Sequence, residues 1–150
     1  MKVAATVVIQ APKEEVFKVF ADIEKVGDRV EGIEKLELLS EVTWGIGLRW
    51  RETRTMFGKE ATEEMEITGF DEPSRYVVEA ESHGTHYTSV YQFTEDGDGG
   101  TQVSWSFEGK PISFVAKLFT PLAYAFKGSI RKALAKDVGD LKRFIESSSQ

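Results

Sequence analysis

The chain has 150 residues, of which 41% are hydrophobic and 29% charged, and its formal net charge is -6. This length and composition predict one globular domain over 1–150 and exclude a wholly disordered, collagen-like or multi-span membrane protein. The absence of cysteine excludes disulfides, thiolate catalysis and thiolate metal sites, and two histidines are too few for a three-histidine site. We expect a cytoplasmic protein with no metal or cofactor, and the negative charge argues against a nucleic-acid partner.

The first thirty residues predict one strand and two short helices. Apolar side chains alternate over Val3–Ile9, which is typical of a strand, and this run is too short for a signal peptide. Pro12 suits the first turn of a helix, and Glu14 and Glu15 complement the positive charge of the helix N-terminus. We expect this helix to reach about Asp22 and a second short helix to follow around 23–28.

The rest of the chain predicts six more strands and then a helical segment. From Gly32 to about Glu108 the hydropathy period is two, with turn signals at 45–47, 58–59, 71–74, 83–84 and 96–100. Apolar residues then recur every three or four positions from Phe114 to Ile145. Because Pro121 interrupts this pattern, we expect a short helix near 112–119, a main helix over about 121–146 and a frayed tail at 147–150.

Four short segments, distributed along nearly the whole chain, have the order and spacing of one known fold. They are IQAPKEEVF at Ile9–Phe17, GIGLRWRE at Gly45–Glu52, GTQVSW at Gly100–Trp105 and LKRFIE at Leu141–Glu146. With these segments the chain resembles the helix-grip superfamily, known as START-like or SRPBCC, of the polyketide cyclase/dehydrase and lipid-transport type. We therefore expect an α+β fold in which a curved seven-stranded antiparallel sheet wraps around a long C-terminal helix, with two short helices between strands one and two.

The turn at 58–59 predicts which charged side chains point toward the helix. A two-residue turn formed by Gly58 and Lys59 fixes four cross-strand pairs on the inner face: Met56 with Ala61, Arg54 with Glu63, Glu52 with Met65, and Trp50 with Ile67. Inward charges need partners or water, because burying an unpaired ion costs several kcal/mol. Three interpretations stay open: a partly solvated pair at the hairpin tip, the polar end of a ligand cavity, or a bulge that turns these side chains outward.

The turn at His83–Gly84 predicts a second set of inward side chains. It pairs Ala80 with Tyr87, Val78 with Ser89, and Tyr76 with Tyr91, and it places His86 on the outer face. The two histidines are thereby separated, which argues against a shared metal site. The hydroxyls of Tyr87, Ser89 and Tyr91 are candidates for hydrogen bonds to a ligand, because a buried hydroxyl needs a partner.

A curved sheet covered by one helix leaves a gap between them, and an empty gap is costly. At about 24 cal/mol per Å³, roughly 300 Å³ left unfilled would cost about 7 kcal/mol. We expect a modest cavity that is filled by bulky side chains, water or a ligand. Most of the aromatic residues are equally well explained as core. The predicted ligand-binding residues are Trp50, Glu52, Arg54, Glu63, Met65, Tyr87, Ser89, Tyr91, Trp105, Phe107, Phe119, Leu122 and Phe126.

Three functions fit these features. The first is binding or transport of a small-to-medium hydrophobic ligand with a polar end. The second, implied by the resemblance, is a polyketide cyclase/dehydrase-like enzyme in which Glu52 or Glu63 transfers protons and Arg54 stabilises an enolate oxygen. The third is an interaction with a membrane or an acidic protein through residues 110–150. These residues carry a net charge of +5, whereas 1–109 carry -11. Attraction between the two halves of the chain across an internal interface is the simpler explanation of this charge distribution. We expect a monomer or a weak dimer.

Overall fold

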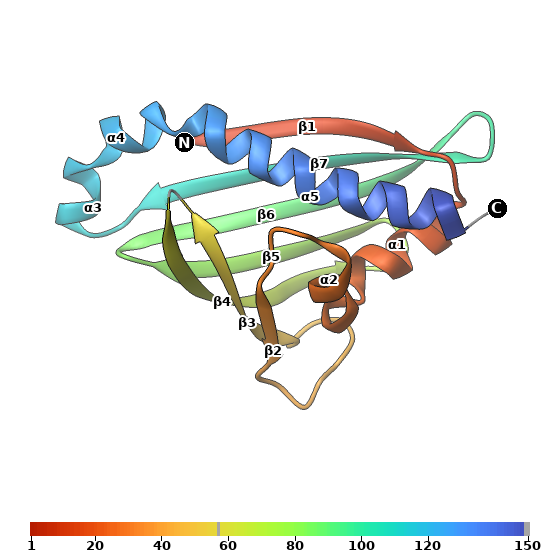
Figure 1. The fold of residues 1–150 in the computed structure, drawn as a ribbon, viewed down its shortest axis with the longest axis horizontal. Helices are drawn as coiled ribbons and strands as arrows, with labels where there is room; N and C mark the ends of the chain where they lie inside the picture. Colours follow the sequence, from red (N-terminus) through yellow and green to blue (C-terminus); the bar gives the residue numbers. More distant parts are fainter. Residues whose placement is uncertain (57, 149–150) are drawn as a thin grey trace.

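The computed structural model describes residues 1–56 and 58–148. Within these residues the chain forms seven strands and five helices (Figure 1). The strands are β1 Lys2–Ile9, β2 Lys35–Leu38, β3 Arg49–Met56, β4 Lys59–Asp71, β5 Arg75–Ser82, β6 Thr85–Asp96 and β7 Gly100–Pro111. The helices are α1 Lys13–Ala21, α2 Ile23–Arg29, α3 Phe114–Leu118, α4 Thr120–Ala125 and α5 Lys127–Ser148.

All the strands belong to one antiparallel sheet in the order β1-β7-β6-β5-β4-β3-β2. Consecutive strands from β2 to β7 are neighbours, and β1 pairs with β7 at the edge. The sheet bends round α5, whose C-terminal end lies beside α1 (Figure 1). The predicted helix-grip architecture is confirmed. In the described part of the chain, no helix combines the length and the hydropathy needed to cross a lipid bilayer.

The pairing of β4 with β5 has one irregularity. It shifts register between Ile67 and Gly69, which is a β-bulge. A Cβ at Gly69 would lie 3.0 Å from Cγ2 of Val77, so a larger residue would require the Val77 side chain to move. A bulge increases the local twist of a strand, so this one adds twist to β4.

One of the two predicted hairpin registers is confirmed and the other is wrong by two residues. Tyr76 pairs with Tyr91, as expected, and His83 and Gly84 both have positive φ in the connecting turn. In the other hairpin, Arg54 pairs with Ala61 instead of Glu63, because Gly58 takes the second turn position and not the first. A shift of two keeps every side chain on its predicted face.

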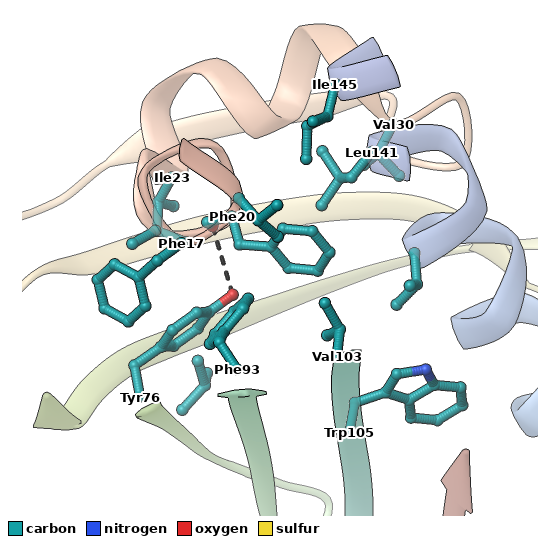
Figure 2. Packing of buried hydrophobic residues seen from close by; sticks show 14 of the residues in the cluster. Phe17, Phe20, Ile23, Val30, Tyr76, Phe93, Val103, Trp105, Leu141 and Ile145 are labelled. Atoms are coloured by element: carbon teal, nitrogen blue, oxygen red, sulfur yellow. Dashed lines mark hydrogen bonds between the residues drawn. The ribbon is translucent and has the colours of Figure 1, made fainter. Parts of the chain in front are cut away.

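Aromatic side chains fill the end of the fold beneath α1. Phe17 is fully buried, and its ring makes edge contacts with four other rings at centroid distances of 5.2–6.3 Å: Trp44, Phe70, Tyr76 and Phe93. The Tyr76 hydroxyl donates a hydrogen bond of 3.3 Å to the carbonyl of Phe20 (Figure 2). Edge-to-face rings gain energy beyond their burial, so this end of the sheet is solidly packed.

The C-terminal segment differs from the prediction of one short and one long helix. The helical path is interrupted at Phe119 and again at Phe126, where ψ is 7° and 1°, so three helices form. Pro121 lies in the first turn of α4, where proline is tolerated, and the break at Phe126 has no glycine or proline to signal it. The helix α5 continues to Ser148, so the predicted frayed tail is wrong for 147–148, and 149–150 lie outside the described residues.

The two halves of α5 are held very differently. In the C-terminal half Val138, Leu141 and Ile145 are buried in the core, and Lys142 Nζ donates a 2.7 Å hydrogen bond to the carbonyl of Val8. The backbone N–H of Glu31 donates to Asp140 at 3.0 Å, which fixes the loop after α2 to the same half. By contrast, none of residues 112–137 is buried.

Candidate functional site

A cavity of about 470 Å³ lies between the inner face of the sheet and the exposed half of α5. Its wall is mainly apolar and includes side chains from α2, from β3 to β7 and from α3 to α5. At about 24 cal/mol per Å³, a dry void of this size would cost about 11 kcal/mol, which is as large as the whole stability of a domain. The space therefore contains water or a ligand.

Ten of the thirteen predicted ligand-binding residues lie in the wall of this cavity. They come from four strands, β3, β4, β6 and β7, and from the turn between α4 and α5: Trp50, Glu52, Arg54, Glu63, Met65, Tyr87, Ser89, Tyr91, Phe107 and Phe126. The alternation of side chains along the strands placed nine of them correctly, because residues two apart share one face. Their role in binding a ligand stays a prediction.

Three of the predicted residues lie outside the cavity wall. Trp105 is 4% exposed and belongs to the hydrophobic core (Figure 2). Phe119 and Leu122 are 59% and 53% exposed and do not line the cavity. The prediction had one break, before Pro121, whereas the structure has breaks at Phe119 and at Phe126, and the second break changes the helical phase. The small side chains of these helices line the cavity instead: Ala116, Thr120, Ala123 and Ala133.

A trio of charged side chains, Glu52, Arg54 and Asp137, joins the sheet to α5 in the cavity wall. Arg54 Nε donates to Glu52 Oε1, and Arg54 Nη1 lies 2.8 Å from Asp137 Oδ2. Trp50 Nε1 donates a 3.3 Å hydrogen bond to the other oxygen of Glu52, which is only 6% exposed. These side chains point inward, so the interpretation as an outward-turning bulge is wrong.

The predicted pairing of Arg54 with Glu63 is also wrong. Because the register is shifted by two, Glu63 lies opposite Glu52, and Ser82 Oγ donates a 3.0 Å hydrogen bond to its Oε1. The partner that the sequence analysis missed is Asp137. It is seven residues after Ile130 and four before Leu141, so helical spacing alone puts this acidic residue on the apolar face of α5.

The loop after α2 covers the ion pair of Arg54 with Asp137. A Cβ at Gly32 would lie 3.2 Å from Arg54 Nη1 and 3.4 Å from Asp137 Oδ1. Glycine thus lets the backbone approach the charged groups closely. This cover limits the access of water to them from the side away from the cavity.

Burial and mutual charge shift the proton equilibria of the trio. Burial raises the pKa of Asp137 to about 6, although the adjacent Arg54 lowers it, and the negative charge of Glu52 adds to the rise. Burial alone lowers the pKa of Arg54, but the two carboxylates outweigh burial and raise it. Two carboxylates share one guanidinium, so the fully ionised trio carries one net negative charge.

Hydroxyl groups lie next to the trio along the same wall. Burial raises the pKa of Tyr91, and the negative charges of Asp137 and Glu52 raise it further. Burial also raises the pKa of Tyr87, with a contribution from Glu63. Among the described residues, the hydroxyls of Ser89 and Tyr91 have no hydrogen-bond partner, although both line the cavity. They are neutral donors and acceptors at the edge of an apolar space.

The two histidines lie away from the cavity. His83 is in the β5–β6 turn, and His86 Nε2 lies 2.9 Å from Glu79 Oε1 on the outer face of the sheet. In residues 1–56 and 58–148 no three His, Asp or Glu side chains cluster so as to hold a metal ion. The cytoplasmic location and the oligomeric state stay predictions.

Solved structures with the same fold cover the full length of the chain. A protein of Thermus thermophilus is 21% identical with a TM-score of 0.79, and the alignment covers 100% of both chains. The Zhui aromatase/cyclase of a Streptomyces species is 18% identical with a TM-score of 0.79, over 100% of this chain and 96% of that one. A START superfamily protein of Mycobacterium smegmatis is 15% identical with a TM-score of 0.72, over 95% and 98%. At these identities the likeness concerns the fold alone.

Sequence comparison gives the family directly. No curated protein sequence matches the chain significantly. The sequence profile of the family described as "Polyketide cyclase / dehydrase and lipid transport" matches residues 1–138, which is most of the chain. Three of the four segments that first indicated the helix-grip superfamily lie within this match, and the fourth, Leu141–Glu146, lies just after it. The chain therefore belongs to the polyketide cyclase/dehydrase and lipid transport family.

Proposed function

We propose that this protein binds a small-to-medium hydrophobic ligand whose polar end is an uncharged hydrogen-bonding group. The observation that carries the proposal is an apolar cavity of about 470 Å³ with one charged trio and a few hydroxyls in its wall. Binding sites for small molecules are mostly apolar cavities of about 300–1,000 Å³ with a small number of placed polar groups. A family that includes lipid transport agrees with a carrier function.

The charges in the cavity wall favour an uncharged polar end over an acidic one. The wall holds three carboxylates, Glu52, Glu63 and Asp137, and one guanidinium. Both carboxylates of the trio already occupy the guanidinium of Arg54, so the carboxylate of a ligand would meet a net negative surface. A hydroxyl or carbonyl group can instead bond to the hydroxyls of Ser89 and Tyr91 without a charge to bury.

A polyketide cyclase/dehydrase-like activity is a second candidate, and one observation favours it. The carboxyl group of Asp137 has a pKa of about 6, close to the pH at which a general acid or base is most effective, and Arg54 lies 2.8 Å from it. In such a reaction the carboxylate would take a proton from the carbon next to a ketone while Arg54 donates a hydrogen bond to the enolate oxygen. Glu52 and Glu63 stay alternative proton-transfer groups. Aromatase/cyclases are among the proteins with this fold.

A matched ligand panel tests the binding proposal. Long-chain alcohols and hydroxylated aromatic polyketides are compared with fatty acids of equal chain length by native mass spectrometry and thermal unfolding. We expect the neutral ligands to bind, with about 2.7 kcal/mol of added stability at a concentration one hundred times Kd. The fatty acids are expected to bind at least about tenfold more weakly above pH 7. Tighter binding of the fatty acids, or no binding by any ligand, contradicts the proposal.

Turnover of a linear poly-β-ketone tests the second candidate. If Asp137 is the proton-transfer group, Asp137→Asn lowers kcat by about 10²–10⁴-fold, and the wild-type rate rises with pH through about 6. Glu52→Gln and Glu63→Gln serve as matched variants of the other two carboxylates. Unchanged turnover in all three variants, or product formed at the rate seen without protein, rules out this activity for the cavity.

Removal of the guanidinium tests whether the trio is truly buried and coupled. Arg54→Met leaves two carboxylates without their partner, and we expect the free energy of unfolding to fall by about 3–5 kcal/mol. The control is Arg51→Met on the outer face of the same strand, where Arg51 forms an exposed ion pair of 2.8 Å with Glu64. Its loss is expected to cost at most about 1 kcal/mol. Equal losses in urea denaturation would contradict a buried trio.

The raised pKa of Asp137 predicts a definite pH dependence of stability. Between about pH 4 and 6 the folded protein holds a proton that the unfolded chain has released, so the free energy of unfolding decreases as the pH rises. A pKa of about 6, compared with the ordinary aspartate pKa of 3.8, corresponds to about 3 kcal/mol over this range. In urea denaturation, the free energy of unfolding of Asp137→Asn should increase by that amount relative to the wild type as the pH rises from about 4 to 6. A constant difference between them, or one of opposite sign, refutes the shift.

A further inference from the structure

The outer side of α3 and α4 exposes a dense group of large apolar side chains. Phe114, Leu118 and Phe119 are 75%, 62% and 59% exposed, and neither α3 nor α4 contains a buried residue. We call this surface the α3–α4 patch, and it consists of Ile112, Phe114, Val115, Leu118, Phe119, Leu122 and Tyr124. Large exposed apolar patches are rare on soluble monomers and mark sites of interaction.

The patch lies within the most basic part of an otherwise acidic chain. From Gly109 to Lys136 there is no Asp or Glu, although the whole chain has a net charge of -6. This stretch contains six cations: Lys110, Lys117, Lys127, Arg131, Lys132 and Lys136. Lys110 pairs with Glu108, and Lys136 pairs with Glu31 and Asp140. For the other four, the described part of the chain supplies no ion-pair partner, so their charge is available to an outside group.

The same short helices separate the patch from the cavity. Ala116, Thr120 and Ala123 line the cavity on the inner side of α3 and α4. The segment is tied to the sheet near its start, where the N–H groups of Ile112 and Ser113 bond to the carbonyl of Gly84 at 2.8 and 3.1 Å. In Figure 1 these helices form one end of the molecule, at the far end of α5 from α1. The patch is therefore the outer surface of a thin cavity wall.

We propose that the α3–α4 patch docks on the surface of an anionic lipid bilayer. Its aromatic and aliphatic side chains enter the boundary between headgroups and acyl chains, and the surrounding lysines and arginines contact lipid phosphates. This combination of apolar and cationic groups without acidic ones is complementary to an anionic bilayer. A symmetric contact with a second copy would instead bring identical cations together. The docking itself does not rest on the proposed ligand.

Vesicle flotation with a matched pair of variants tests the apolar part of the proposal. The vesicles contain phosphatidylcholine alone or with about one third phosphatidylglycerol. We expect the wild type to float with the anionic vesicles and Phe114→Ser/Leu118→Ser to lose at least about tenfold in binding. The control is Val42→Ser/Ile46→Ser, because these side chains are also exposed, at 43% and 63%, but lie in the loop before β3. Equal binding by both double variants overturns the proposal.

A second pair of variants tests the cationic part. Lys127→Gln/Arg131→Gln/Lys132→Gln is expected to weaken binding to anionic vesicles at least about tenfold, because each cation near the surface contributes separately. Lys18→Gln/Lys25→Gln/Lys59→Gln removes the same charge from exposed positions outside the patch and is expected to bind as the wild type does. About 1 M NaCl, which shortens the Debye length to about 3 Å, should release the wild type. Equal effects of the two triple variants contradict the proposal.

All the substituted side chains are exposed, so the variants are expected to fold. Light scattering then tests whether the patch is instead a contact between two copies of the chain. The proposal predicts that the wild type and Phe114→Ser/Leu118→Ser have the same oligomeric state. A wild-type dimer that becomes monomeric in Phe114→Ser/Leu118→Ser, together with no flotation, would identify the patch as a subunit interface. A wild type that binds an acidic protein through the patch but neither vesicle type would equally overturn bilayer docking.

Discussion

The ionic contact between Arg54 and Asp137 ties the long helix to the sheet at the point where the fully buried apolar side chains of the helix end. In the described residues, α5 has no buried side chain before Val138, and the contact of 2.8 Å lies just at that boundary. Glu52 holds the same guanidinium from the sheet, and Gly32 allows the loop after α2 to cover it. A charged trio is a costly connection, because desolvation opposes it. It leaves open space beside it, which apolar packing would close.

The fold is therefore solid at one end and hollow at the other. Around Phe17 the aromatic rings pack edge to face, and the C-terminal half of α5 is fixed there by Lys142 and Asp140. Beyond Asp137, α5 contributes Ile130 and Leu134 to a cavity, whereas α3 and α4 contribute alanine and threonine to it and expose their large side chains. This arrangement places a space for an apolar molecule directly behind an exposed apolar and basic surface. The proposed binding in the cavity and the proposed docking of its outer wall both rest on this uneven packing.

The sequence predicted the fold and the inward faces because both depend on local periodicity. Alternation along the strands and the His83–Gly84 turn were enough to place Tyr87, Ser89 and Tyr91 in the cavity wall. The 58–59 turn was misplaced by one position, which changed the partner of Arg54 but not its face. The break at Phe119 is close to the boundary predicted before Pro121, but the second break at Phe126 was not predicted, so the exposure of Phe119 and Leu122 did not follow from spacing. Asp137 was visible as an acidic residue on an apolar helical face.

The proposed ligand occupies the cavity with its polar end at the hydroxyls of Ser89 and Tyr91, next to the trio. Nuclear magnetic resonance of the arginine side chains observes this directly, because the Nε–Hε signals of Arg54 and Arg51 report on the inner and outer faces of one strand. Titration with a long-chain alcohol is predicted to shift the Arg54 signal and the ring signals of Tyr91 in a saturable manner while Arg51 stays unchanged. Saturable binding of the alcohol that leaves both Arg54 and Tyr91 unperturbed would contradict the account.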